Sequence, residues 1–243
     1  MKLLILAVLA VIGASHAARP GANEVIDTFR SIVPRYIDTI AEDQQQIFAL
    51  EHEETQALTQ FHSDIVRTKE TFVKSVTLQE DQLNGLMRGQ NTSVADGQCM
   101  QFVQRATNET VNVIGVAYTT CINEADESLG NVTASYYGSI GALEQAATNL
   151  RLLDVFRGDN VFYTPYNIVN KLHQKEADLL QNRPPLAAEL ETQKQGFEAD
   201  LMEIRNRYIV CMTTAEMSFR TYIDLARQQL SYICGANLNI VEN

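Results

Sequence analysis

The four cysteines are the residues of this chain whose chemistry the spacing specifies best. Cys99 and Cys121 bracket one helical stretch, and Cys211 and Cys234 bracket a second stretch of nearly the same form. A helix of about 22 residues rises ~33 Å, whereas the Cα atoms of a disulfide lie within ~7 Å of each other. Neither pair can close within its own helix, so the bridges must join one helix to the other.

Two pairings satisfy this condition. Counting the helices between the two stretches alternately up and down makes the cysteine-bearing helices antiparallel, which favours Cys99–Cys234 with Cys121–Cys211. A parallel arrangement would instead give Cys99–Cys211 and Cys121–Cys234, and it stays open because connectivity does not follow from spacing alone. No close C-x₂₋₄-C pair is present, which argues against a structural zinc site.

The other residues with reactive side chains form no catalytic pattern. His52-Glu53-Glu54-Thr55-Gln56 lacks the second histidine of the H-E-x-x-H zinc motif. His52 and His62 are separated by nearly three helical turns, so one helix cannot bring both to one metal. Glu51, Glu53 and Glu54 are typical of a solvated acidic patch. We therefore predict no enzyme, no catalytic residue, no metal site and no cofactor.

The first 17 residues, MKLLILAVLAVIGASHA, have the pattern of a cleaved secretory signal. Lys2 precedes an apolar run from Leu3 to Ala14, and Ser15 and Ala17 give the small-x-small pattern before a cleavage site. The run is short for a bilayer span, which leaves an uncleaved anchor as the lesser alternative. No other stretch is apolar enough to span a membrane. We expect a secreted, extracellular protein without a transmembrane anchor.

Sequons and charge agree with that compartment. Sequons without proline begin at Asn91, Asn108 and Asn131, the second of them inside a predicted helix. The chain carries 30 acidic residues against 19 basic ones, and loss of Lys2 with the signal takes the net charge from −11 to −12. Because phosphates demand a basic face, this balance argues against nucleic-acid partners.

The helices are predicted from apolar periodicity, and strand patterns are nearly absent. From Leu186 to Ile233, apolar or small residues recur about every 3.6 positions, with Pro184-Pro185 before the stretch and Gly235 after it as a cap. Cys211 lies on this stripe. Two shorter helices are predicted upstream, one from about Ala134 to Phe156 and one from Thr164-Pro165 to Arg183, with a turn at residues 157–160 between them.

The N-terminal third carries two further stripes. One covers Ile26 to Ile47 and the other Leu58 to Val76, and Pro34 is expected to kink or restart the first helix. The predicted fold class is all-α, a long-helix bundle with two inter-helix disulfides. We divide the chain into a signal peptide (1–17), an N-terminal helical arm or hairpin (18–90) and a four-cysteine helical bundle (91–243).

The four-cysteine region resembles the TsetseEP domain of insect secreted proteins. The resemblance covers about residues 96–236 and rests on the cysteine spacing, the helical character, the signal peptide, and Tyr118 and Tyr232 before the closing cysteines. It implies a gut or immune-related extracellular factor and no catalytic residues. The family's namesake ends in Glu-Pro repeats, and this chain has no Glu-Pro dipeptide, so no activity tied to such repeats is implied.

We therefore expect a secreted, non-enzymatic interaction protein whose partner is an extracellular protein or a cell or microbial surface. The alternative is a carrier of lipid or a small apolar ligand, since amphipathic helices and bundle cores can hold such molecules. Two inter-helix disulfides oppose opening of residues 99–234, whereas residues 22–83 contain no cysteine.

Overall fold

The structure, a computed structural model, is built of helices and describes residues 20–89, 96–182 and 186–236. In chain order the elements are α2 (Pro20–Arg88), α3 (Gly97–Thr148), the 3₁₀-helix η1 (Leu152–Phe156), α4 (Pro165–Ala177), the π-helix η2 (Asp178–Asn182) and α5 (Leu186–Tyr232). These three ranges contain no strand, so the predicted all-α class is confirmed.

The described residues fall into two compact units, and the three long helices contribute to both. The first unit contains residues 20–52 and 137–194. The disulfide unit contains residues 53–136 and 195–236. Each unit has its own buried apolar residues, as described below.

The disulfides join α3 to α5 at two levels of the disulfide unit. Cys99 is bonded to Cys234 and Cys121 to Cys211, with Cα atoms 5.4 and 5.8 Å apart. The first cysteine of α3 is therefore bonded to the last cysteine of the chain, and the second cysteine of α3 to the third. This pairing means that α3 and α5 run antiparallel in this unit. The favoured pairing is confirmed and the parallel alternative is wrong. Such bridges are compatible with the oxidising conditions outside cells.

An apolar seam fills the space between α3 and α5. Its residues recur every three or four positions, so that they lie on one face of each helix. The ring centroids of Tyr136 and Phe197 stack 4.4 Å apart across the seam. The buried members include Val103, Ile114, Tyr118, Leu129, Leu201, Ile204, Tyr208, Met212, Phe219, Ile223 and Leu230.

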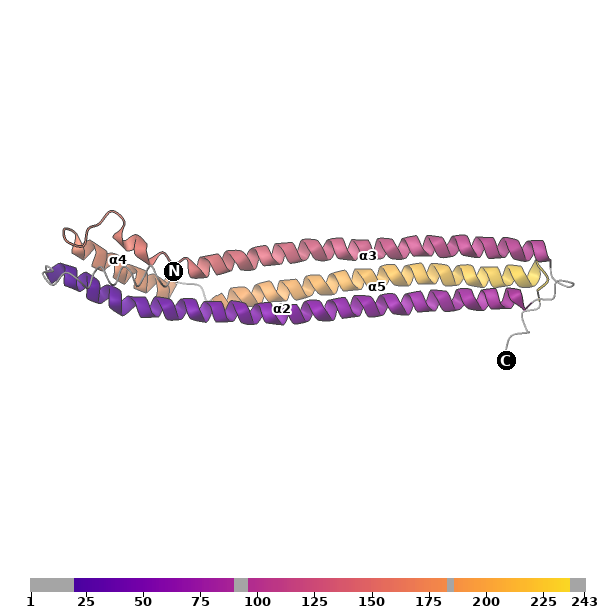
Figure 1. Cartoon of the computed structure of the whole chain (residues 1–243), viewed down its shortest axis with the longest axis horizontal. Coiled ribbons are helices and arrows are strands. Elements are labelled where there is room, and N and C mark those ends of the chain that lie inside the picture. Colours follow the sequence, from indigo (N-terminus) through magenta and orange to yellow (C-terminus); the bar gives the residue numbers. More distant parts are fainter. Residues whose placement is uncertain (1–19, 90–95, 183–185, 237–243) are drawn as a thin grey trace. The chain divides into compact units, whose positions relative to one another are not determined.

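The second half of α2 completes the disulfide unit without a covalent link. Figure 1 shows it alongside α3 and α5. Asp64 pairs with Arg205 across 3.2 Å, and the Ser75 hydroxyl donates to Glu216 across 2.6 Å. Phe61, Val76 and Leu83 are the buried apolar residues of this segment, and Leu83 is fully buried. The unit is a three-helix arrangement in which only two of the helices are bridged.

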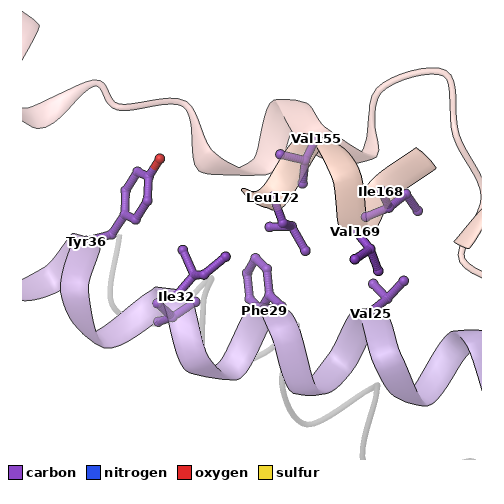
Figure 2. Packing of buried hydrophobic residues seen from close by; sticks show 9 residues of the cluster. Val25, Phe29, Ile32, Tyr36, Val155, Ile168, Val169 and Leu172 are labelled. Carbon is purple, nitrogen blue, oxygen red and sulfur yellow. The ribbon is translucent and has the colours of Figure 1, made fainter. Parts of the chain in front are cut away.

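The core of the first unit lies where the start of α2 meets η1 and α4. Val25, Phe29, Ile32 and Tyr36 are spaced four, three and four positions apart, so they share one face of α2. Figure 2 shows Val25 and Phe29 pointing toward Val169 and Leu172 of α4. The Phe29 and Phe156 rings lie 5.7 Å apart, and the Tyr36 hydroxyl donates to the Lys175 carbonyl across 2.9 Å.

Two expectations about α3 are wrong. The separate helix from Ala134 to Phe156 does not exist, because α3 continues unbroken past Cys121 to Thr148. Ala125 and Leu129 are buried and extend the apolar seam through this stretch, which compensates for the helix-weakening Gly130. The chain then leaves the α-helix at 149–151 and forms η1, so residues 152–156 are 3₁₀-helical.

Two expectations about the N-terminal third also need correction. α2 is one continuous helix that contains Pro34, so the helix does not restart there and residues 20–88 are not a hairpin. The buried face is rotated from the predicted stripe, because Val25, Ile32 and Tyr36 are buried while Ile37 is exposed. Helices η1 and α4 cover that face, and the sequence stripe alone does not reveal their position.

The predicted long helix from Leu186 is confirmed as α5, which ends at Tyr232. Gly235 takes a positive φ of 68° just beyond the end, and the Ala236 N–H donates to the Leu230 carbonyl. Cys211 is only half-buried, and Ile233, the first residue after α5, is exposed.

In the described ranges, no helix is long and apolar enough to cross a membrane.

Candidate functional site

Two of the three predicted glycosylation sites lie on the surface of α3. Asn108 and Asn131 are exposed, in the disulfide unit. Asn91 lies outside the described residues. Both described sequons are therefore accessible in the folded chain, although each sits within a helix.

The histidines and acidic residues do not converge on a reactive centre. His52, His62 and His173 are exposed, and the Nδ1 atom of His173 lies 3.7 Å from a Glu176 oxygen. Across the part of the chain that the structure describes, no group of three or more His, Cys, Asp and Glu side chains could hold a metal ion.

The predicted acidic patch is wrong for one member. Glu51 and Glu53 are exposed, but Glu54 is only 2 % exposed. Glu54 follows the buried Leu50 by four positions on the same face of α2, which turns its side chain inward.

The segment between η1 and α4 is held in one conformation by its own hydrogen bonds. The Lys171 ammonium bonds both the Asp159 carboxylate and the Arg157 carbonyl. The Asn167 amide donates to the other Asp159 oxygen across 3.1 Å. Asn160 accepts from the Phe162 N–H through its side chain and from the Thr164 N–H through its carbonyl, each across 2.8 Å. Residues 157–167, which we call the braced loop and which include the first three residues of α4, therefore have a defined backbone.

The braced loop carries three aromatic side chains that face solvent. Phe162 is 52 % exposed, Tyr163 80 % and Tyr166 66 %. We call these three residues the aromatic surface. Exposed aromatic clusters on a fixed backbone are typical of contact surfaces, because they lose little conformational entropy on binding. This cluster lies entirely within the first unit.

The charge of Asp159 strengthens the hydrogen bonds that hold the braced loop. Hydrogen bonds from Lys171, Asn167 and Thr164 lower the pKa of Asp159 from 3.8 to about 2. The carboxylate is therefore ionised, and it accepts these bonds at all physiological pH values.

An apolar pocket of about 300 Å³ lies beside the core of the first unit. One wall is α2 and the other is the stretch that links α3 to η1. Its lining residues are Phe29, Val33, Tyr36, Ile37, Ile40, Thr148, Asn149, Leu150, Arg151, Leu152 and Leu153. The volume is at the lower end of the range for small-molecule sites.

A second pocket of about 500 Å³ shares Tyr36 and Leu150 with the apolar pocket and differs in charge. Lys175, Asp178 and Glu189 contribute to its wall. Burial, followed by the charges of Asp178 and Glu176, raises the pKa of Tyr36, so its hydroxyl stays protonated and keeps its bond to the Lys175 carbonyl.

Neither the aromatic surface nor the apolar pocket was among the predicted sites. In the sequence, Asn160 to Tyr166 indicates a turn followed by a helix start. The dense aromatics there, three in five residues, are the signal that could have identified a surface. The pocket has no local signal, because its two walls are more than 100 positions apart in the chain.

No protein-family model, no curated protein and no solved structure matches this chain.

Proposed function

We propose that this chain is a secreted, non-enzymatic protein that binds an extracellular protein through the aromatic surface. The observation that carries the proposal is the exposure of Phe162, Tyr163 and Tyr166 on a loop held by its own hydrogen bonds. Tyrosine is enriched among the residues that dominate binding energy at protein interfaces, because its ring buries area while its hydroxyl keeps a polar partner.

Secretion is supported by three independent features. These are the signal-like first 17 residues, the sequons at Asn91, Asn108 and Asn131, and the pairing of all four cysteines. Expression in insect cells should place the protein in the medium. Treatment with an N-glycosidase should increase its mobility, and Asn108→Gln and Asn131→Gln identify which described sequons are used. Retention in the cells without glycan would contradict the assignment.

The binding proposal is tested by placing a photo-crosslinking phenylalanine analogue at position 163. Partners captured from native extracellular fluid are identified and then produced in pure form. Tyr163→Ala should weaken binding to the pure partner by 2 kcal/mol or more, roughly thirtyfold, which is typical of a hot spot.

The matched control is Val116→Ala, which removes an exposed apolar side chain from α3 in the disulfide unit. It should leave the affinity unchanged. Equal effects of the two substitutions would contradict a role for the aromatic surface. Binding only to vesicles or to a microbial wall would replace the protein partner with a surface.

A carrier of a small apolar ligand is the second candidate function, and the apolar pocket favours it. Protein purified from its native source is extracted with organic solvent and the extract is analysed by mass spectrometry. A stoichiometric apolar molecule would support the carrier, and an empty protein would argue against it.

A further inference from the structure

We infer that the apolar pocket binds a small anionic amphiphile, a monocarboxylate with an aliphatic tail of about ten carbons, with its carboxylate at Arg151. This inference rests on the second candidate function, the carrier, and is independent of the aromatic surface. It is carried by the composition of the pocket walls, the charge at their edge and the volume that they enclose.

The walls select an apolar tail. Six of the lining side chains are aliphatic, and Phe29 adds a ring. Two of the polar lining groups already have hydrogen-bond partners. The Tyr36 hydroxyl donates to the Lys175 carbonyl, and the Thr148 hydroxyl donates to the Glu144 carbonyl across 2.8 Å. A ligand body with polar groups would lose its hydrogen bonds to water there without replacing them, whereas a hydrocarbon has no such bonds to lose.

The edge of the pocket selects a negative head group. Arg151 is the one charged residue in the lining, and it is exposed. Within the described part of the chain it forms no ion pair. A guanidinium binds a carboxylate through two parallel hydrogen bonds, which a neutral alcohol cannot reproduce.

The neighbouring charged pocket does not compete for that head group. Its wall contains Asp178 and Glu189 against the single Lys175, so its net charge is unfavourable for an anion. The charge difference between the two pockets therefore orients the ligand, with its head at Arg151 and its tail toward α2.

The backbone at Arg151 is a further sign of a specialised position. Its φ of 46° and ψ of 41° place it in the left-handed region, the only non-glycine residue with positive φ among those described. Such conformations are disfavoured for residues with a Cβ and cluster at ligand-binding sites. Arg151 is the N-cap of η1, so this conformation lies in the second wall of the pocket, where the chain that has left α3 enters η1.

The volume limits the length of the tail. About 300 Å³ corresponds to roughly ten water volumes, or a packed ligand of about ten to twelve non-hydrogen atoms. Decanoate is of this size. Its affinity should exceed that of hexanoate by about fourfold per added methylene. Chains longer than decanoate should gain little more, because the pocket is then full.

The test is titration calorimetry of the purified, disulfide-bonded protein with decanoate, decanol and decyltrimethylammonium, all below their aggregation concentrations. Decanoate should bind best and the cationic analogue worst. Arg151→Gln should weaken decanoate about tenfold and leave decanol unchanged. The control Arg157→Gln changes a nearby exposed arginine outside the lining and should have no effect.

A second variant separates the pocket from the head group. Ile37→Trp places a bulky indole ring at an exposed position of the lining and should abolish binding of decanoate and decanol alike. Phe48→Trp, on the same helix but outside the lining, should not.

The possible results distinguish failure of the anionic-ligand proposal from failure of the carrier function. Equal binding of decanol and decanoate, with no effect of Arg151→Gln, would overturn the anionic ligand and leave the carrier standing. Binding that survives Ile37→Trp would overturn the pocket as the site. Absence of binding by all three probes, together with an empty native protein, would overturn the carrier itself.

Discussion

Gly21 and Gly85 lie in the same helix but in different surroundings. A Cβ at Gly21 would lie 2.7 Å from the Cγ atom of Pro165, whereas a Cβ at Gly85 would meet nothing within 4 Å. Gly21→Ala should therefore lower the free energy of unfolding by about 1–3 kcal/mol through overpacking. Gly85→Ala should raise it by about 0.5–1 kcal/mol, because alanine has the higher helix propensity.

Chemical denaturation of both variants measures these changes directly. The opposite signs are the informative feature, since both substitutions are chemically identical. If Gly21→Ala were neutral or stabilising, the contact between the start of α2 and Pro165 would not contribute to folding.

Asp159 makes the braced loop sensitive to acid. Because hydrogen bonds, chiefly from Lys171, lower its folded-state pKa from 3.8 to about 2, its contribution is complete above 3.8 and is lost as the pH falls toward 2. Asp159→Asn should lower the thermal midpoint at neutral pH, and the difference from the unsubstituted protein should vanish toward pH 2.

The control for this measurement is Asp154→Asn in η1, which changes an exposed carboxylate outside the brace. Its effect should not show the same loss between those two pH values. A constant difference between the Asp159→Asn variant and the unsubstituted protein at every pH would mean that the carboxylate charge does not stabilise the loop.

At the scale of the element, the disulfides should add stability without being needed for helix formation. The Cys121–Cys211 bridge joins residues 90 positions apart, so its removal in Cys121→Ser/Cys211→Ser could cost up to about 4–5 kcal/mol by loop entropy. The helical circular dichroism at low temperature should remain, because the apolar seam between α3 and α5 is intact. Complete loss of helix in this variant would mean that the seam alone cannot hold the two helices.

The elements show which features could be predicted from the sequence. Covalent geometry requires that the bridges join the two cysteine-bearing helices, and a long apolar period predicts the extent of α5. Both are local or pairwise properties. The predicted pairing nevertheless depends on four helices of alternating direction, whereas α3 is one helix where the prediction has two. The antiparallel result holds nonetheless, because the two disulfides show that the chain reverses direction between α3 and α5.

The features that were missed depend on tertiary contacts. Ile37 belongs to the predicted apolar stripe, yet it is exposed at the pocket, and Tyr36 beside it is buried against α4. Phe162 and Tyr163 are of residue types common in protein cores, yet they are exposed on a segment fixed by the hydrogen bonds of Asn160 and Asp159. These arrangements depend on which segments meet, and a periodic pattern within one segment does not specify that.

At the scale of the whole molecule, the two units should respond differently to reduction. Both bridges lie in the disulfide unit, and the core of the first unit, centred on Phe29, Ile168 and Leu172, contains no cysteine. Local opening free energies follow the contacts of each region, so they need not change together. Hydrogen exchange with and without reductant measures them separately.

Reduction should accelerate amide exchange in residues 97–136 and 195–232, and it should leave α4 and residues 25–36 of α2 unchanged. Residues 53–88 provide the internal comparison, since they belong to the same helix as residues 25–36 but pack in the disulfide unit. Their exchange should also become faster, because reduction loosens α3 and α5, against which they pack. The Cys99→Ser/Cys234→Ser/Cys121→Ser/Cys211→Ser variant controls for effects of the reductant itself. Uniform acceleration along α2 would show instead that its packing in both units opens as one cooperative event.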